Sequence, residues 1–109
     1  MAYDEGLAQI LRDALDSTDG IIEKKMFGGM SFMLNGNMLC GVHKGGAMFR
    51  VGKENEAAAM AVEGTSPLAF TGKKMGGLLD VSDECLINDT SRDALLALAF
   101  NFVGALPAK

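Results

Sequence analysis

The spacing of apolar residues changes along the chain, and this change predicts the order of helices and strands. Near the start, apolar positions recur every three or four residues, which is typical of an amphipathic helix that Asp4 can cap and Gly20 ends. Near the end, a helix that is apolar nearly all round is expected to be buried on more than one side, with Ser82 or Thr90 as its cap and Pro107 after it. Between these helices the period shortens, which favours strands.

Short apolar segments and glycine-containing turns fill the middle of the chain. Asn35-Gly36 is the strongest hairpin signal, because both central residues of a type I′ turn need positive φ. This turn predicts that residues 30–34 pair with residues 37–43, and residues 47–51 are expected to add a third antiparallel strand. Residues 54–62 then favour a helix, and residues 68–71 and 77–81 two further strands. The chain, residues 1–109, is therefore predicted to be a single two-layer α+β domain in the order helix, three strands, helix, two strands, helix, with an antiparallel sheet.

The hairpin predicts two apolar faces, of which helices would cover only one. A regular register from the Asn35-Gly36 loop opposes Met33 to Met38. One face then carries Met30, Phe32, Leu34 and Leu39, and the other carries the interface candidates Met33, Met38, Cys40 and Val42. The sequence leaves open which face meets the helices, because the next turn can use Gly45-Gly46 alone or add Lys44. We expect a homodimer over the uncovered face; the alternative is that a helix, or the strands after Pro67, covers it within one chain.

The charged residues are distributed unevenly along the chain. The net charge is −4 and the pI about 4.8, which makes direct nucleic-acid binding unlikely to be the function. Residues 24–74 carry seven Lys or Arg and three Asp or Glu, a net +4, whereas the flanks sum to −8. No apolar run approaches the ~20 residues of a membrane span, and the acidic start does not resemble a signal peptide. With Cys40 and Cys85 in no paired motif, we expect a cytoplasmic protein with no membrane contact.

Residues capable of catalysis or metal binding are few. His43 is the only histidine, and nothing in the sequence places a nucleophile or an orienting carboxylate beside it. One histidine and two distant cysteines form no zinc site, so no catalytic residue, cofactor or metal is predicted. Five basic residues could instead converge on an anion or a partner, or could form polar strand edges that resist aggregation. They are Lys24, Lys25, Arg50, Lys73 and Lys74.

Several short motifs together resemble one family. They are Lys24-Lys25-Met26-Phe27-Gly28-Gly29, Phe32, Asn35-Gly36 with Met38 and Gly41, Arg50-Val51-Gly52, Phe70-Thr71-Gly72 and Leu106-Pro107. In combination they closely resemble the TfoX/Sxy N-terminal domain family, from near Ile21 to Pro107.

The resemblance implies a two-layer α+β domain and a role in gene regulation. Longer members of this bacterial family carry a second, helical domain and regulate natural competence, acting with a cyclic-AMP receptor-type activator. This chain would then be a stand-alone N-terminal domain without the C-terminal one. The resemblance also implies a non-enzymatic interaction domain that acts through a protein partner in transcription or competence regulation. The alternative is a small anion-binding protein or enzyme that uses Arg50 and the lysine pairs.

Overall fold

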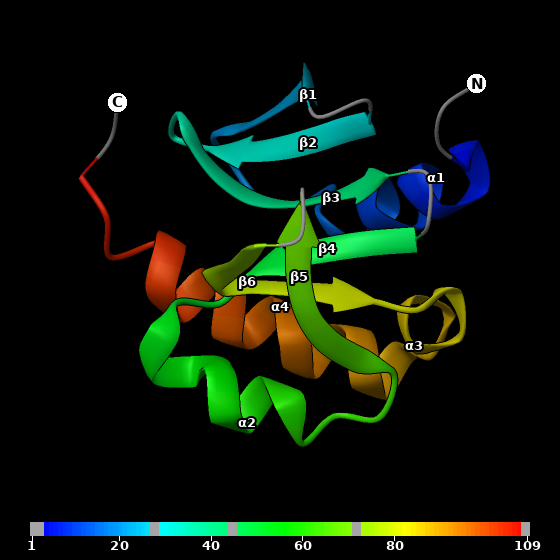
Figure 1. The fold of residues 1–109 in the computed structure, drawn as a ribbon. Helices are drawn as coiled ribbons and strands as arrows, with labels where there is room; N and C mark the ends of the chain where they lie inside the picture. Colours follow the sequence, from blue (N-terminus) through cyan, green and yellow to red (C-terminus); the bar gives the residue numbers. More distant parts are fainter. Residues whose placement is uncertain (1–3, 27–28, 44–45, 71–72, 108–109) are drawn as a thin grey trace.

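A six-stranded antiparallel sheet is the centre of the molecule, and its strands lie in the order β1-β2-β3-β4-β6-β5. Figure 1 shows the computed structural model, which describes residues 4–26, 29–43, 46–70 and 73–107. The elements are α1 (Glu5–Ala14), β1 (Ile21–Met26), β2 (Gly29–Leu34), β3 (Asn37–His43), β4 (Gly46–Arg50), the 3₁₀ helix η1 (Lys53–Asn55), α2 (Glu56–Met60), β5 (Thr65–Phe70), β6 (Lys73–Val81), α3 (Asp83–Ile87) and α4 (Asp89–Val103). The α+β class and the antiparallel sheet predicted from the sequence are confirmed.

Two details of the element order differ from the prediction. The structure adds the strand β1 before the hairpin, pairing Ile21 with Leu34 and Met26 with Gly29. Most of its described side chains are exposed, because β1 is an edge strand, and so the alternating burial that reveals a strand is absent from its sequence. The last helix is also divided in two, because the backbone at Asn88 is extended (φ −74°, ψ 116°).

Side-chain caps explain where the helices begin. The Asp4 carboxylate accepts hydrogen bonds from the amides of Gly6 (2.7 Å) and Leu7 (3.3 Å), as predicted. Ser82 caps α3 by accepting from the Cys85 amide at 3.2 Å, and the Asn88 side chain caps α4. Ser82 is therefore the cap of the short helix, and Asn88, rather than Thr90, is the cap of the long one.

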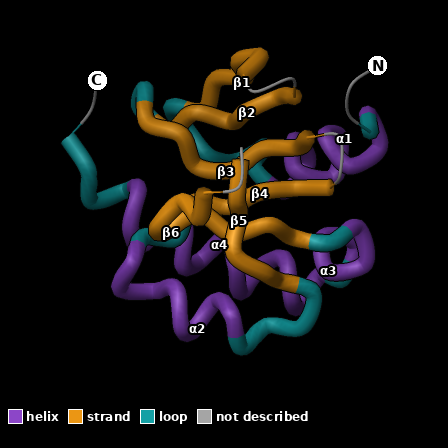
Figure 2. Tube along the Cα trace, in the orientation of Figure 1, coloured by secondary structure: helices purple, strands orange, loops and turns teal. Residues whose placement is uncertain are grey.

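The helices α1, α3 and α4 lie together behind the sheet, as Figure 2 shows. Their apolar sides and the facing strands form the core, which also includes Ala59 of α2. Its members are Leu7, Ala8, Leu11, Leu15, Phe32, Leu34, Leu39, Cys40, Val42, Ala47, Phe49, Val51, Ala59, Leu79, Val81, Cys85, Leu86, Leu95, Leu96, Ala99 and Val103. At the margin of the core, the buried Asn37 side chain donates to the carbonyl oxygen of Pro107 at 2.9 Å, which ties the segment after α4 to the start of β3.

The register of the β2–β3 hairpin shifts after its second pair. Leu34 opposes Asn37 and Met33 opposes Met38 as predicted, but Phe32 then opposes Cys40 instead of Leu39. The extra residue on β3 is a β-bulge, which changes the side of the sheet reached by the residues beyond it. Cys40 and Val42 therefore lie on the helix side with Phe32, so the expected register and the expected composition of the two faces are wrong from this point onward.

The front face of the sheet, opposite the helices, is partly covered by the chain itself. Met48 belongs to this face, because a Cβ on its neighbour Gly41 would lie 3.1 Å from the Met48 Cε atom, and Met48 is completely buried. Figure 1 shows β5 crossing in front of the sheet, on the side away from α4. Of the two readings left open by the sequence, cover by the strands after Pro67 therefore applies at the centre of this face.

We predict that Gly36→Val destabilises the protein. Asn35 and Gly36 both have positive φ (51° and 86°), as the type I′ turn requires, and a β-branched residue is strained in that conformation. The expected loss is about 1 kcal/mol or more of unfolding free energy, measured by thermal or urea unfolding. Asn35→Gly, which relieves rather than adds strain, is the control; a Gly36→Val variant that unfolds at the wild-type midpoint would contradict the role assigned to the turn.

Candidate functional site

One row of apolar side chains remains on the front face at the β1 end of the sheet. The strand register places Ile22 opposite Met33 and Met33 opposite Met38, so these three residues are neighbours across β1, β2 and β3. Ile22 is 65% exposed, and the two methionines are half-buried. We call these three residues the outer patch; an exposed apolar surface on a sheet edge can bind another chain.

The other two interface candidates, Cys40 and Val42, are placed in the core. Both are completely buried beneath the helices, because the bulge turns them to that side. Burial raises the pKa of the Cys40 thiol, and burial also raises the pKa of the Cys85 thiol, so neither side chain presents a thiolate nucleophile. Of the predicted interface set, only Met33 and Met38 lie on the front face.

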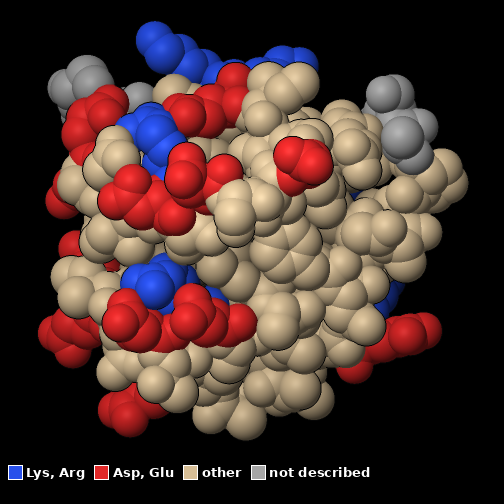
Figure 3. Space-filling model, turned by 180° about the vertical axis from the view of Figure 1, so that it is seen from behind, with Lys and Arg blue, Asp and Glu red and all other residues tan. Residues whose placement is uncertain are grey.

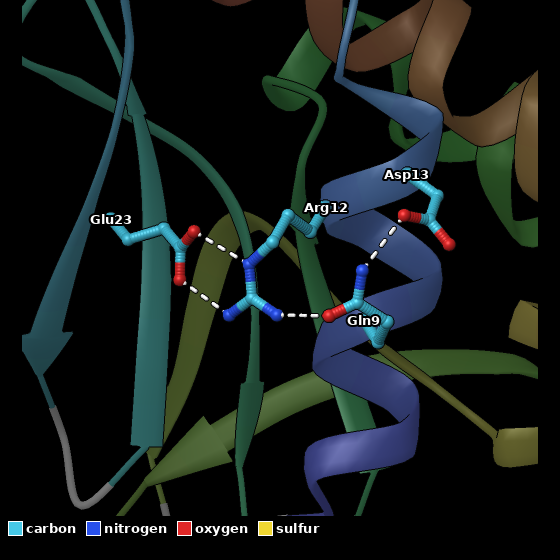
Figure 4. A network of polar contacts seen from close by, with 4 residues as sticks. All are labelled: Gln9, Arg12, Asp13 and Glu23. Carbon is cyan, nitrogen blue, oxygen red and sulfur yellow. Dashed lines mark hydrogen bonds and ion pairs between the residues drawn. The ribbon is translucent and has the colours of Figure 1, made fainter.

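The edge strand β1 is fastened to α1 by the ion pair of Arg12 and Glu23 (Figure 4). The Arg12 Nε and Nη2 atoms donate to the two Glu23 carboxylate oxygens at 2.7 and 2.6 Å. Gln9 accepts from the same guanidinium and donates to Asp13, so the network also follows one side of α1. Hydrogen bonding from Arg12 lowers the pKa of the Glu23 carboxyl below its ordinary value.

The predicted basic residues whose side chains the structure describes do not gather into one site. Lys24 and Lys25 lie on β1, both exposed, and their side chains alternate between the two sides of the sheet. Arg50 ends β4, three strands away, which is about 14 Å at the usual strand spacing. Lys73 and Lys74 begin β6, but their side chains lie outside the described part of the chain. Lys24 and Lys25 thus occupy a strand edge, where lysines oppose unwanted strand pairing.

Arg50 lies in a hollow of its own with a volume of about 400 Å³. The carbon at the centre of its guanidinium group is 5.4 Å from the centre of the Phe102 ring, within the range of a cation–π contact. Gly52, Lys53, Glu54 and Gly77 complete the lining. The sequence identified Arg50 as a candidate, but it offered no sign that Phe102, from the far end of the chain, would be its neighbour.

A carboxylate that could not be assigned from the sequence lies beside His43. The Nε2 atom of His43 on β3 lies 2.8 Å from the Asp80 Oδ1 atom on β6, so the two side chains reach across β4. Gly46, which opposes His43 on β4, leaves room for this contact because it has no side chain. The sequence alone places no carboxylate beside His43, and the structure adds Asp80 there. A signal was present: Asp80 is the polar residue between the buried Leu79 and Val81, and so belongs to the front face.

Acidic side chains gather on one half of the helix side of the molecule (Figure 3). Exposed carboxylates belong to α3 and the start of α4, namely Asp83, Glu84, Asp89 and Asp93, and we call them the acidic surface. Arg92 lies among them, 2.9 Å from Asp89 and 3.5 Å from Asp93. Beside them, Glu63 and Glu84 line a hollow of about 300 Å³. Acidic residues that lie close together in the sequence after β6 thus form a negatively charged area on the surface of the protein.

Neither a cluster of metal-binding side chains nor a membrane-spanning helix is found among the described residues. Among them, no three His, Cys, Asp or Glu side chains are grouped so that they could hold a metal ion. No described helix combines the length and the hydropathy needed to cross a bilayer.

The fold and these surfaces define a two-layer α+β domain with separate apolar and acidic contact surfaces and a half-buried arginine site. The TfoX N-terminal domain family matches the chain over residues 13–103. The protein therefore belongs to the TfoX N-terminal domain family, as the motifs around the Asn35-Gly36 hairpin implied. No curated protein and no solved structure matches the chain.

We predict that the Arg12–Glu23 pair stabilises the protein only while Glu23 is ionised. Because the folded-state pKa of Glu23 is lowered, this stability is present above the ordinary Glu value of about 4.3 and is lost as pH falls through the lowered value. The two side chains are 36% and 34% exposed, so solvent screens the pair and we expect about 0.5 kcal/mol.

Urea unfolding of the wild type and of Glu23→Gln at pH 7 and pH 3 measures this effect. The variant should be less stable at pH 7, and the difference should shrink toward zero at pH 3. Glu63→Gln, at an exposed position, is the control and should match the wild type at both pH values. An equal difference at both pH values would show that the charge of Glu23 is not the cause.

Proposed function

We propose that this protein is a non-enzymatic interaction domain that acts in gene regulation through a protein partner in the cytoplasm. The observation that carries the proposal is the match to the TfoX N-terminal domain family over residues 13–103. The resemblance implies a relation to longer proteins that are competence regulators and work with a transcription activator. The two buried free cysteines, Cys40 and Cys85, suit a reducing compartment.

The chemistry of the described side chains supports binding rather than catalysis. The His43–Asp80 pair has the geometry of a base held by a carboxylate, but nucleophilic catalysis needs a third, activated group. Both cysteines have a raised thiol pKa and are buried, so neither supplies that group. The pair instead joins β3 to β6 across the front face.

The acidic surface is the contact we assign to the partner. A transcription activator that binds DNA carries basic surfaces, and complementary charge speeds and orients association. The hollow between Glu63 and Glu84 can receive a lysine or arginine side chain of such a partner. The same negative charge opposes direct contact with the DNA backbone, so regulation would pass through the partner.

The outer patch is the contact we assign to a second copy of the chain. Ile22, Met33 and Met38 form a continuous apolar row, and a twofold axis near this row would bury it against itself. Because Lys24 and Lys25 stand on the same strand, the two edges would meet face to face rather than by adding strand to strand. A homodimer formed in this way leaves both acidic surfaces open for partners.

We predict that a transcription activator is retained by the protein from extract of its native cells, and that retention depends on the acidic surface and on the hollow beside it. Glu63→Lys combined with Glu84→Lys should abolish it, whereas the control Asp19→Lys with Glu54→Lys makes the same charge change elsewhere and should preserve it. Affinity capture with mass spectrometry measures this, and raising the salt should weaken capture. Equal capture by both double variants, or tight binding of random duplex DNA at physiological salt, would contradict the proposal.

We predict a homodimer at micromolar concentration whose dissociation constant rises at least about tenfold in Ile22→Glu, because the variant places a carboxylate in an apolar contact. Ile87→Glu on α3 is the matched control, since Ile87 is 59% exposed but lies outside the outer patch. Sedimentation equilibrium distinguishes the dimer from the monomer of 11.5 kDa. A single monomeric species for the wild type, or equal weakening by both variants, would rule out this interface.

A further inference from the structure

The Arg50 guanidinium is a half-buried cation with no acidic partner among the described residues. Its guanidinium carbon instead lies over the Phe102 ring, 5.4 Å from the centre of the ring, as a cation–π contact. Glu54 lines the same hollow, yet no ion pair joins it to Arg50 within the described part of the chain. Partly burying a charge without a counter-charge is unfavourable, so a cation held in this way can gain free energy by binding an anion.

The floor of the hollow is made by two glycines whose backbones cross. A Cβ on Gly77 would lie 3.0 Å from the Gly52 Cα, and a Cβ on Gly52 would lie 2.4 Å from the Phe102 Cδ1 atom. Glycine at position 52 therefore leaves room for the ring, and glycine at position 77 lets the two backbones approach closely. The Gly77 carbonyl accepts from the amides of Val51 (2.9 Å) and Gly52 (3.2 Å), so these two amides are already used within the protein.

Further hydrogen bonds hold the walls of the hollow in place. The side-chain Nδ2 atom of Asn55 donates to the Val51 carbonyl oxygen and to the Asn101 Oδ1 atom, both at 3.1 Å, which joins η1 to the residue after β4 and to α4. The Gly77 amide donates to the Glu56 Oε2 atom at 3.1 Å, which joins β6 to α2. The arginine, the ring and the glycine floor are thus positioned before any ligand arrives, as in most small-molecule sites.

The charges around the hollow distinguish between classes of anion. The planar guanidinium can donate two parallel hydrogen bonds to a carboxylate, and the exposed Lys53 at the rim adds a second cation. Glu54 at the same rim repels a ligand of higher negative charge, such as a phosphate ester. The Phe102 ring and the glycine backbone offer an apolar wall for a flat hydrocarbon group.

We propose that this hollow binds a small aromatic carboxylate, with the carboxylate on the Arg50 guanidinium and the ring of the ligand against the wall formed by Phe102 and Gly52. The site is separate from the outer patch and the acidic surface, and its occupancy does not depend on the partner contacts. A volume of about 400 Å³ admits a ligand of one or two rings.

The proposal is tested by titrating the ¹⁵N-labelled protein with four probes that separate charge from ring. These are benzoate, benzamide, acetate and phenyl phosphate. Benzoate should shift the Gly52 and Gly77 amide signals and saturate with a dissociation constant on the order of 1 mM, as expected for a ligand of this size. Benzamide lacks the charge and acetate lacks the ring, and phenyl phosphate is repelled by the Glu54 carboxylate. Each should therefore bind at least about fivefold more weakly than benzoate.

Variants then separate a specific site from general attraction of anions. Arg50→Met should weaken benzoate binding about tenfold or more, and Arg50→Lys, which keeps the charge but loses the fork, should fall between that variant and the wild type. Lys24→Gln removes a cation from the opposite edge of the sheet and should leave binding unchanged. If Arg50→Met does not fold, two measurements still test the proposal. One is the probe series on the wild type, and the other is the Phe102→Leu variant, in which benzoate should bind more weakly. No shift at Gly52 and Gly77 with 20 mM benzoate, equal affinity for benzamide, or equal affinity of Arg50→Met would overturn the proposal.

Discussion

The register of the β2–β3 hairpin determines which side chains reach the core and which remain at the surface. The turn at Asn35-Gly36 begins the pairing, and the bulge after the Met33–Met38 pair shifts it by one residue. Because side chains alternate across a strand, this single residue turns Cys40 and Val42 toward the helices. Phe32, Leu39, Cys40 and Val42 are all almost completely buried as a result. The helix layer packs against Cys40 and Val42, which the bulge turns toward it.

Features that depend on neighbouring residues could be predicted from the sequence, and features that depend on distant ones could not. The Asp4 cap, the Asn35-Gly36 turn and the α+β order follow from local chemistry, since each needs only a few adjacent residues. The bulge buries Cys40 and Val42 against helices that are distant in sequence. It therefore could not be predicted from the residues of the hairpin alone. The strand β1 was missed for a similar reason: it is defined by pairing with β2 and by the ion pair to α1, not by its own apolar pattern.

The candidate sites show the same division. Arg50 could be singled out by its residue type, but its environment comes from Phe102 and Gly77, which are distant in sequence. Asp80 is 37 residues from His43, and the contact exists because β6 lies next to β4 in the sheet. Conversely, Lys24 and Lys25 are adjacent in sequence and point to opposite sides of a strand. The strand order brings some distant residues together and separates some neighbours, and the composition of each surface follows from that order.

The hydrogen bond between Asn37 and the Pro107 carbonyl has a consequence for the way the chain acquires its structure on the ribosome. Its two residues are separated by 70 positions, and the Asn37 side chain is only 3% exposed. The β2–β3 hairpin can form while synthesis continues, because its contacts are local, but the Asn37 amide lacks this acceptor until residue 107 has left the exit tunnel. A nascent chain stalled before that point would hold the hairpin with a polar group unsatisfied at the margin of its core. Completion of this contact therefore waits for a residue 70 positions after Asn37, long after the hairpin itself can form.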